Sequence, residues 1–236
     1  MAGKVTVMRI RICEFVEGAE NATGVTVIID VFRAFSVACY AFNAGASGII
    51  PVGNPEDARL LQRKIKHSVL AGERDEKKIA GFDLGNSPTE IIQADLDGRY
   101  LIHATTAGTR GINSAKGASV ILAAALVNVS ATANYIKKLN PADVTLVAMG
   151  YRAEKTAEED IICAEIISDR LKGGNADFTE KIKMLREGSG ARFFKPGNIG
   201  FSPPSDFFLC TMTDRFDFAL RAERRGDGFM ELFRKE

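Results

Sequence analysis

Six short runs of apolar and β-branched residues recur along the chain, and they constrain the fold more than any other feature. The runs are residues 25–31, 47–53, 68–73, 99–106, 119–126 and 143–150. They lack the alternation of apolar and polar residues that marks a half-exposed antiparallel sheet, so they are typical of buried strands. A strand that is buried on both faces needs a layer of helices on each side.

Segments with helical periodicity lie between several of these runs. Asn54 is a capping residue, followed by a proline at the first helical position and by two acids, and this pattern predicts a helix over about 55–67. Further helices are predicted over 128–138 and 156–171. Because strands alternate with helices, the sequence predicts an α/β protein whose mostly parallel sheet is covered by helices.

The length of 236 residues suits one domain over 1–236, with two α/β lobes of about 1–125 and 126–236, and the site between them, as the alternative. The stretch 187–208 holds four glycines and three prolines. We expect it to form a lobe edge or an interface. The Phe-rich segment that follows favours a homodimer.

The charge balance excludes some classes of partner. The chain has 31 basic and 30 acidic side chains, and nucleic acids or anionic membranes attract proteins with a clustered positive charge. We therefore expect neither partner. No apolar run reaches the 18 residues that a membrane span requires.

Cysteine and histidine usage points to the compartment and to the kind of metal. The four cysteines are scattered and the start of the chain lacks a continuous apolar stretch, so we expect free thiols, no signal peptide and a cytoplasmic protein. His67 and His103 have no metal-ligand spacing. Any metal should therefore be a hard cation that oxygen atoms bind.

Charged and polar side chains follow four of the predicted strands, at the edge where open α/β sheets bind ligands. These side chains are Asp30 and Arg33 after the first run, Glu73 and Arg74 after 68–73, Asp83, Asn86 and Ser87 in the loop GFDLGNSP, Thr105, Thr106, Gly108, Thr109 and Arg110 in TTAGTR, and Arg152, Glu158, Glu159 and Asp160 after the last run.

The segment TTAGTR (105–110) is the most informative of these ends. Hydroxyls, a glycine and an arginine at a strand-to-helix turn can form a cradle for an anion. The chain contains no P-loop, dinucleotide-binding or hydrolase-elbow motif. The acids at the other ends suit Mg²⁺, which takes one or two carboxylates and completes its shell with water and phosphate oxygens. The residues therefore predict an Mg²⁺-assisted site for a small phosphorylated anion.

Several of these residues also have structural interpretations. Asp30 could cap the next helix, and the acids at 158–160 could favour the first turn of theirs. His103 could be a general acid, although its place inside a strand favours a buried histidine with a hydrogen-bond partner. Cys163 lies on an apolar helix face without a basic neighbour, which disfavours a nucleophile. A non-catalytic binder or sensor of a phosphorylated acid is the alternative function.

Four segments together resemble a known family. IDVFRA, GERDEKKIAGFDLGNSP, TTAGTRGI and EEDIICAEII resemble, in this order and spacing, the 2-phosphosulfolactate phosphatase (ComB) family of coenzyme M biosynthesis, and the resemblance covers roughly residues 25–170. It implies an Mg²⁺-dependent phosphoric monoester hydrolase in an α/β fold. Its expected reaction is hydrolysis of 2-phosphosulfolactate, or of a related 2-phospho-hydroxy acid, to sulfolactate and phosphate.

The resemblance also implies roles for individual residues. We expect catalytic roles for Asp30, Arg33, Glu73 and Arg110, substrate binding by Arg74, Asp83, Asn86, Ser87, Thr105, Thr106, Gly108 and Thr109, and metal binding by Asp30, Glu159 and Asp160. The turn 105–110 should hold the phosphate, and the loop 86–87 with Arg74 the acid end of the substrate. Direct attack by water and a phosphoenzyme through Asp30 both remain open. Ala107 and Phe35 stand where the family usually has polar residues, so the substrate is less defined than the reaction.

Overall fold

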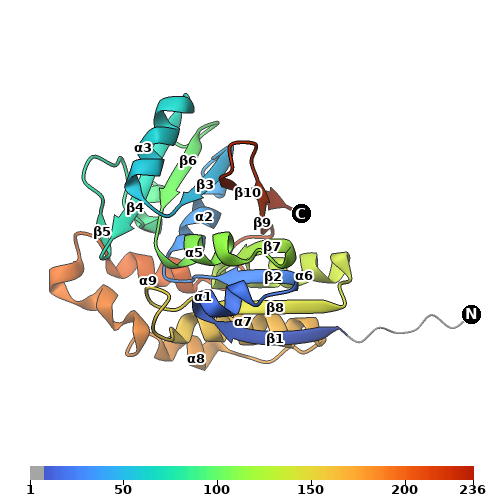
Figure 1. Cartoon of the computed structure of the whole chain (residues 1–236). Helices are drawn as coiled ribbons and strands as arrows, with labels where there is room; N and C mark the ends of the chain where they lie inside the picture. The colour runs from blue at the N-terminus through green and yellow to red at the C-terminus, as the bar shows by residue number, and fades with distance from the viewer. Residues whose placement is uncertain (1–7) are drawn as a thin grey trace, which may run out of the picture.

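All six predicted strands form, and they lie in a sheet of ten strands in the computed structural model, which describes residues 8–236 (Figure 1). The strands are β1 (Arg9–Glu14), β2 (Gly24–Ile29), β3 (Gly48–Val52), β4 (Ser68–Arg74), β5 (Lys77–Lys78), β6 (Tyr100–Ala104), β7 (Ala118–Ala124), β8 (Asp143–Ala148), β9 (Ala219–Arg224) and β10 (Met230–Lys235). Their order across the sheet is β1-β8-β2-β7-β9-β10-β3-β6-β4-β5.

Most neighbouring strands are parallel, which confirms the predicted fold class. The four strands β1, β8, β2 and β7 form one parallel block, and β3, β6 and β4 form another. Between the blocks lie β9 and β10, which are antiparallel to each other and to their neighbours β7 and β3. Because β8 lies between β1 and β2, segments before and after residue 125 share one sheet.

Helices connect the strands, and the three predicted helices all form. The helices are α1 (Phe15–Glu20), α2 (Ala34–Asn43), α3 (Pro55–Lys64), α4 (Pro88–Ile91), α5 (Ala107–Ser114), α6 (Val129–Leu139), α7 (Glu158–Leu171), α8 (Thr179–Met184) and α9 (Pro204–Thr211), with 3₁₀ turns η1 (Leu126–Asn128), η2 (Ser189–Phe194) and η3 (Pro196–Asn198). The predicted cap of α3 is present, since Asn54 Oδ1 accepts the N–H of Asp57 at 2.7 Å.

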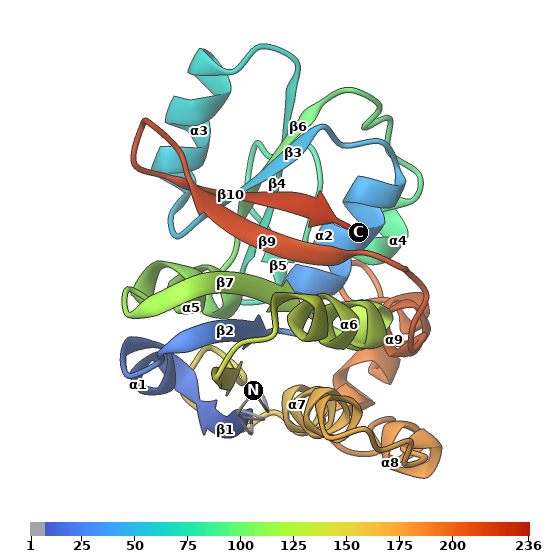
Figure 2. The ribbon, with the colours of Figure 1, turned by 90° about the vertical axis from the view of Figure 1, so that its right-hand side faces the viewer.

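Helices cover both faces of the sheet. Alternate residues of β3 and β6 belong to two apolar clusters: Ile50 and Ile102 pack with α3, whereas Ile49 and Leu101 pack in the larger cluster that includes α2 and α4. Figure 2 shows α1, α3 and α5 on one side of the sheet and α2, α6 and α7 on the other. Buried apolar surface on both faces fixes the sheet, and with it the loops at the strand ends.

Other sequence predictions concern the termini and the cysteines. Within residues 8–236 no helix combines the length and apolar character needed to cross a membrane. The prediction of no signal peptide rests partly on residues 1–7, which lie outside the described residues. All four cysteines are free thiols, as predicted. The stretch 187–208, for which a lobe edge or an interface stays a prediction, supplies one side chain of the candidate site, Arg192.

Candidate active site

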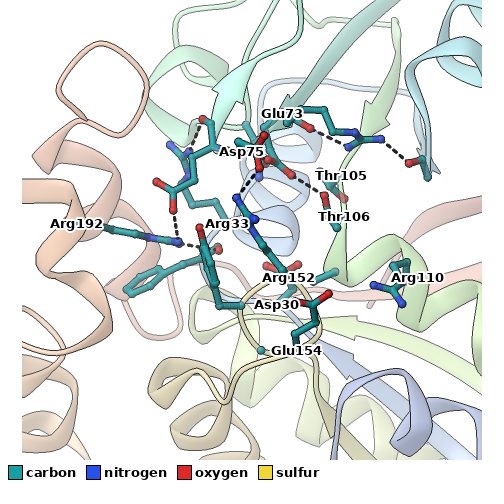
Figure 3. A pocket seen from close by; sticks show the side chains of 18 residues that line it. Asp30, Arg33, Glu73, Asp75, Thr105, Thr106, Arg110, Arg152, Glu154 and Arg192 are labelled. Carbon is teal, nitrogen blue, oxygen red and sulfur yellow. Dashed lines mark hydrogen bonds and ion pairs between the residues drawn. The ribbon is translucent and has the colours of Figure 1, made fainter. Parts of the chain in front are cut away.

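A pocket of about 360 Å³ lies at the carboxyl ends of the parallel strands, as the strand-end rule predicts (Figure 3). It is lined by Asp30, Phe32, Arg33, Gly53, Glu73, Arg74, Asp75, Glu76, Asn86, Thr105, Thr106, Ala107, Arg110, Gly150, Tyr151, Arg152, Glu154 and Arg192. Eight of the predicted site residues are brought together here: Asp30, Arg33, Glu73, Arg74, Asn86, Thr105, Thr106 and Arg110.

Asp30 follows β2 and is buried at the pocket wall. Its Oδ1 accepts the N–H of Ala34, at the start of α2, and its Oδ2 accepts the N–H of Gly108 in α5 at 2.9 Å. The helix-cap interpretation of Asp30 is therefore correct, and the same carboxylate also faces the pocket. Burial raises the pKa of Asp30 to about 6, with a further contribution from the negative charge of Glu73. Asp30 can therefore exchange a proton near neutral pH.

Arg33, from the loop after β2, is fixed by a buried ion pair. Its Nη1 lies 2.5 Å from Oδ2 of Asp206, a residue of α9. Oδ1 of Asp206 accepts the Ser87 hydroxyl at 2.8 Å and the backbone N–H of Thr89 at 3.0 Å. Asp206 thus joins the loop that carries Arg33 to the loop that carries Asn86, and it fixes both at the pocket.

The segment 105–110, which the sequence predicts as an anion cradle, lies at the start of α5. Thr105, Thr106 and Arg110 line the pocket, and residues 8–236 offer the Arg110 guanidinium no hydrogen bond or ion pair. Gly108 lies behind them, where a Cβ atom would meet the Phe35 ring and the Asp30 carboxylate. This close approach explains the glycine. The cradle therefore brings to the pocket one guanidinium that has no partner among the described residues, and this group can pair with an anion.

Glu73 and Arg74 end β4, the sheet neighbour of β6, beside the turn 105–110. Glu73 Oε1 accepts the Thr106 hydroxyl at 3.2 Å, which links β4 to the cradle. Arg74 donates to the backbone carbonyls of Glu73 and Gly53, so no carboxylate neutralises it among the described residues. Arg74 and Arg110 are thus the two pocket arginines without an acidic partner in this part of the chain.

Glu159 and Asp160 do not line the pocket. Asp160 lies behind its wall, where its carboxylate accepts the N–H groups of Val31 and Gly150 at 2.8 and 2.9 Å. Burial raises the pKa of Asp160 well above its usual value, and the charges of Glu159 and Asp30 add to this effect. Burial also raises the pKa of Glu159. Both acids open α7, as predicted, and Asp160 fixes the loops after β2 and β8.

Four further predicted residues lie outside the pocket lining: Asp83, Ser87, Gly108 and Thr109. Asp83 is exposed and accepts the N–H of Leu70 at 2.8 Å. Thr109 is buried and shares a hydroxyl hydrogen bond of 2.9 Å with Thr105. These four residues lie behind or beside the pocket, where their hydrogen bonds and packing hold its loops in place.

His103 and Cys163 behave as structural residues. His103 Nε2 lies 3.0 Å from Oδ1 of Asn86, and burial lowers the pKa of His103 to about 3. A neutral histidine positions the Asn86 amide, which confirms the interpretation as a buried, hydrogen-bonded residue. Burial raises the pKa of the Cys163 thiol well above its usual value, so Cys163 is no nucleophile.

Sequence reasoning missed several residues of the site. These are Asp75, Glu76, Tyr151, Glu154 and Arg192 in the pocket and Asp206 behind it. Arg192 and Asp206 belong to the stretch with four glycines and three prolines, which was assigned no part in the site. The length and irregularity of this stretch were the signal that could have indicated these residues, because long irregular segments in compact domains often carry function.

Fold and site together define an α/β protein with a pocket of acidic, basic and hydroxyl side chains at the carboxyl edge of its sheet. Residues 12–190 match the family model described as 2-phosphosulpholactate phosphatase, so the chain belongs to that family. This confirms the resemblance that the four sequence segments indicated.

Relatives named probable 2-phosphosulfolactate phosphatase come from bacteria and archaea. The protein of Caldanaerobacter subterraneus subsp. tengcongensis is 40% identical over 148 residues, which cover 62% of this chain and 61% of the relative. That match therefore spans less than two thirds of the relative. The Bacillus subtilis protein is 31% identical over 86% of this chain and 89% of its own. The Thermoplasma volcanium protein is 36% identical over 84% of this chain and 89% of its own length.

Proposed function

We propose that this chain is a phosphatase that hydrolyses 2-phosphosulfolactate, or the phosphate ester of a related 2-hydroxy acid, to the hydroxy acid and inorganic phosphate. The single observation that carries the proposal is the position of Asp30. This buried carboxylate, with a pKa of about 6, shares one pocket with the threonine and arginine side chains of the turn 105–110. The printed names of the relatives agree with this reaction.

The reaction needs an anion site and a group that handles a proton. Water forms a bond to phosphorus, the ester P–O bond breaks, and the leaving oxygen takes up a proton. Arg110 and Arg74 stabilise the phosphoryl oxygens, whose charge the transition state retains, and Thr105 and Thr106 line the pocket beside them. Asp30 orients the attacking water and can hold its proton.

Mg²⁺ fits this pocket, although not through all three of the predicted ligands. Residues 8–236 contain no group of three or more His, Cys, Asp or Glu side chains arranged to hold a metal ion. Mg²⁺ needs only one or two carboxylates. Asp30 and Glu73 both line the pocket; burial, and to a smaller extent the charge of Glu73, raises the pKa of Asp30, and a bound cation would offset this negative charge. These two acids would hold the ion, which would supply positive charge to a phosphoryl oxygen.

A phosphate-release assay tests the proposal. We expect the protein to release phosphate from 2-phosphosulfolactate or 2-phospholactate in Mg²⁺, and to lose this activity in excess EDTA and regain it with added Mg²⁺. Full activity in EDTA would contradict the metal, and tight binding without phosphate release would instead support the non-catalytic binder. A cytoplasmic location, a homodimer and a place in coenzyme M biosynthesis remain predictions.

A further inference from the structure

The turn between β4 and β5 carries two neighbouring acids to the pocket. The antiparallel strands are joined by Asp75 and Glu76, which have φ angles of 52° and 69°. Positive φ at both residues is the geometry of a tight two-residue hairpin turn, where glycine or asparagine is usual. Here both positions hold carboxylates instead, and both line the pocket.

Each of these acids pairs with an arginine from a different segment. Asp75 pairs with Arg152, which follows β8, and Glu76 Oε1 lies 2.8 Å from Nη1 of Arg192, which belongs to η2. The side chain of Arg152 is 50% exposed, whereas that of Arg192 is only 18% exposed. Water screens an exposed ion pair more than a buried one. The pair of Arg192 with Glu76 is therefore the stronger of the two.

Arg192 is held from behind independently of Glu76. Its Nη2 donates to the carbonyl of Phe32 at 3.0 Å, and its guanidinium lies 5.2–5.9 Å from the ring centres of Phe32, Tyr151 and Phe193. Its Nε is buried and has no hydrogen-bond partner within residues 8–236. The guanidinium is therefore preorganised, with a donor still unused.

Arg192 and Arg110 lie at opposite sides of the pocket (Figure 3). If the turn 105–110 holds the phosphate, as the proposed function requires, the other side must receive the remainder of the substrate. That remainder carries two acid groups in 2-phosphosulfolactate, and this side offers two arginines, each with an acid from the hairpin as its partner.

We propose that Arg192 is a specificity-determining residue that binds a non-reacting acid group of the substrate, and that Glu76 occupies its guanidinium until that group replaces it. The inference rests on the proposed function and assigns the substrate class at the same site. It predicts opposite effects at the two residues. Loss of the arginine weakens binding of acidic substrates, and loss of the competing carboxylate strengthens it.

Three phosphate esters distinguish binding of the acid groups from binding of the phosphate. Isopropyl phosphate, 2-phospholactate and 2-phosphosulfolactate carry zero, one and two further acid groups on a similar skeleton. For Arg192→Gln we expect kcat/KM for 2-phosphosulfolactate to fall about 10-fold or more beyond any fall for isopropyl phosphate, the size of one charge-assisted hydrogen bond. For Glu76→Gln we expect a several-fold lower KM for 2-phosphosulfolactate.

Arg186→Gln is the matched control. It removes the same charge six residues earlier, from a side chain over the Phe194 ring that does not line the pocket, so the ratio between esters should stay that of the wild type. Melting temperatures of all variants check that they fold. Equal losses on all three esters for Arg192→Gln, or a higher KM for 2-phosphosulfolactate in Glu76→Gln, would overturn the inference.

A binding measurement with the product acids distinguishes failure of this inference from failure of the proposed function. If the wild type releases no phosphate from any of the esters, the proposed function fails. Titration calorimetry with sulfolactate and lactate then tests Arg192 directly. We expect the wild type to bind sulfolactate more tightly and Arg192→Gln to lose that preference. A wild type without the preference, or a variant that keeps it, contradicts the assignment.

Discussion

The two ends of the sheet use arginine and aspartate in opposite ways. At the amino ends of β1 and β8, Arg9 donates to both oxygens of Asp143 at 2.7 and 2.9 Å, and the Arg9 side chain is 77% exposed. At the carboxyl edge, the Arg33 and Asp206 side chains are 3% and 0% exposed. The same two residue types thus form a surface pair in water and a buried pair behind a pocket.

The difference shows what burial changes. Two charges in water interact weakly, and either can be removed with little effect. Two buried charges depend on each other, because removing one leaves the other without water or a partner. The carboxyl edge, where Asp30 and Asp160 are also buried with raised pKa values, is therefore the part of the sheet where single substitutions should have large effects.

The largest effect should come from Asp206→Ala. It leaves the Arg33 guanidinium buried without a carboxylate and removes the acceptor for the Ser87 hydroxyl and the Thr89 N–H. We expect the free energy of unfolding to fall by about 3–5 kcal/mol. Urea denaturation of the variant and wild type measures this difference. A variant as stable as the wild type would remove the contrast between the two ends of the sheet.

Asp30→Asn should affect activity strongly while the fold persists. Loss of one preorganised charged group in an active site lowers kcat by about 10²-fold or more. We expect this fall in phosphate-release assays, with a melting temperature within a few degrees of wild type. An active but less stable variant would show that Asp30 serves only as the cap of α2.

The same variant has a signature in the pH dependence of stability. The pKa of Asp30 is about 6 in the folded chain against an ordinary value of 3.8, so its contribution to stability is present below about pH 4 and lost as pH rises through 6. In EDTA, the loss of stability between pH 5 and pH 7 should be smaller for Asp30→Asn than for wild type. Equal losses would contradict the raised pKa.

Arg110→Lys should have an intermediate effect. Lysine keeps the charge but cannot form the planar fork that contacts two phosphoryl oxygens. We expect kcat/KM to fall by about 10-fold, which corresponds to about 1.4 kcal/mol. Arg9→Lys at the opposite end of the sheet is the control and should match the wild type. If Arg110→Lys also matches the wild type, the turn 105–110 does not hold the phosphate.

Asp143→Asn should have the smallest effect. Its partner Arg9 is exposed, and water replaces the lost contact. We expect a change in melting temperature of less than about 2 °C and unchanged kinetics. A large loss of stability would mean that burial does not distinguish the two pairs.

Much of the fold could be predicted because apolar runs record burial on both faces. The runs that became β2, β3, β6 and β8 are almost wholly buried. By contrast, α2 is buried on nearly every side and shows no polar face, so no helical period marks it. The edge strand β1 and the hairpin of β9 and β10 carry charged residues, which obscured them as strands.

The site residues that could be predicted are those whose place at the end of a strand is enough to bring them to the pocket. Asp30 and Thr105 each follow a buried strand and Glu73 lies near the end of one, and the strand-end rule brings such residues together. The rule does not say which way a side chain points, and Asp83 lies outside the pocket lining, where it accepts the N–H of Leu70. Arg192 reaches the pocket through an irregular segment, and no periodic pattern places such a residue in space.

The central position of β9 and β10 has a consequence for the order of assembly. These two strands follow the other eight in the chain, yet they lie between β7 and β3. Until they pair, each of those strands presents an open edge that can associate with another polypeptide. The pocket takes Asp30 and Arg152 from one block of strands and Glu73 and Arg110 from the other. A nascent chain therefore contains every predicted catalytic residue before the two strands that join the blocks have been synthesised.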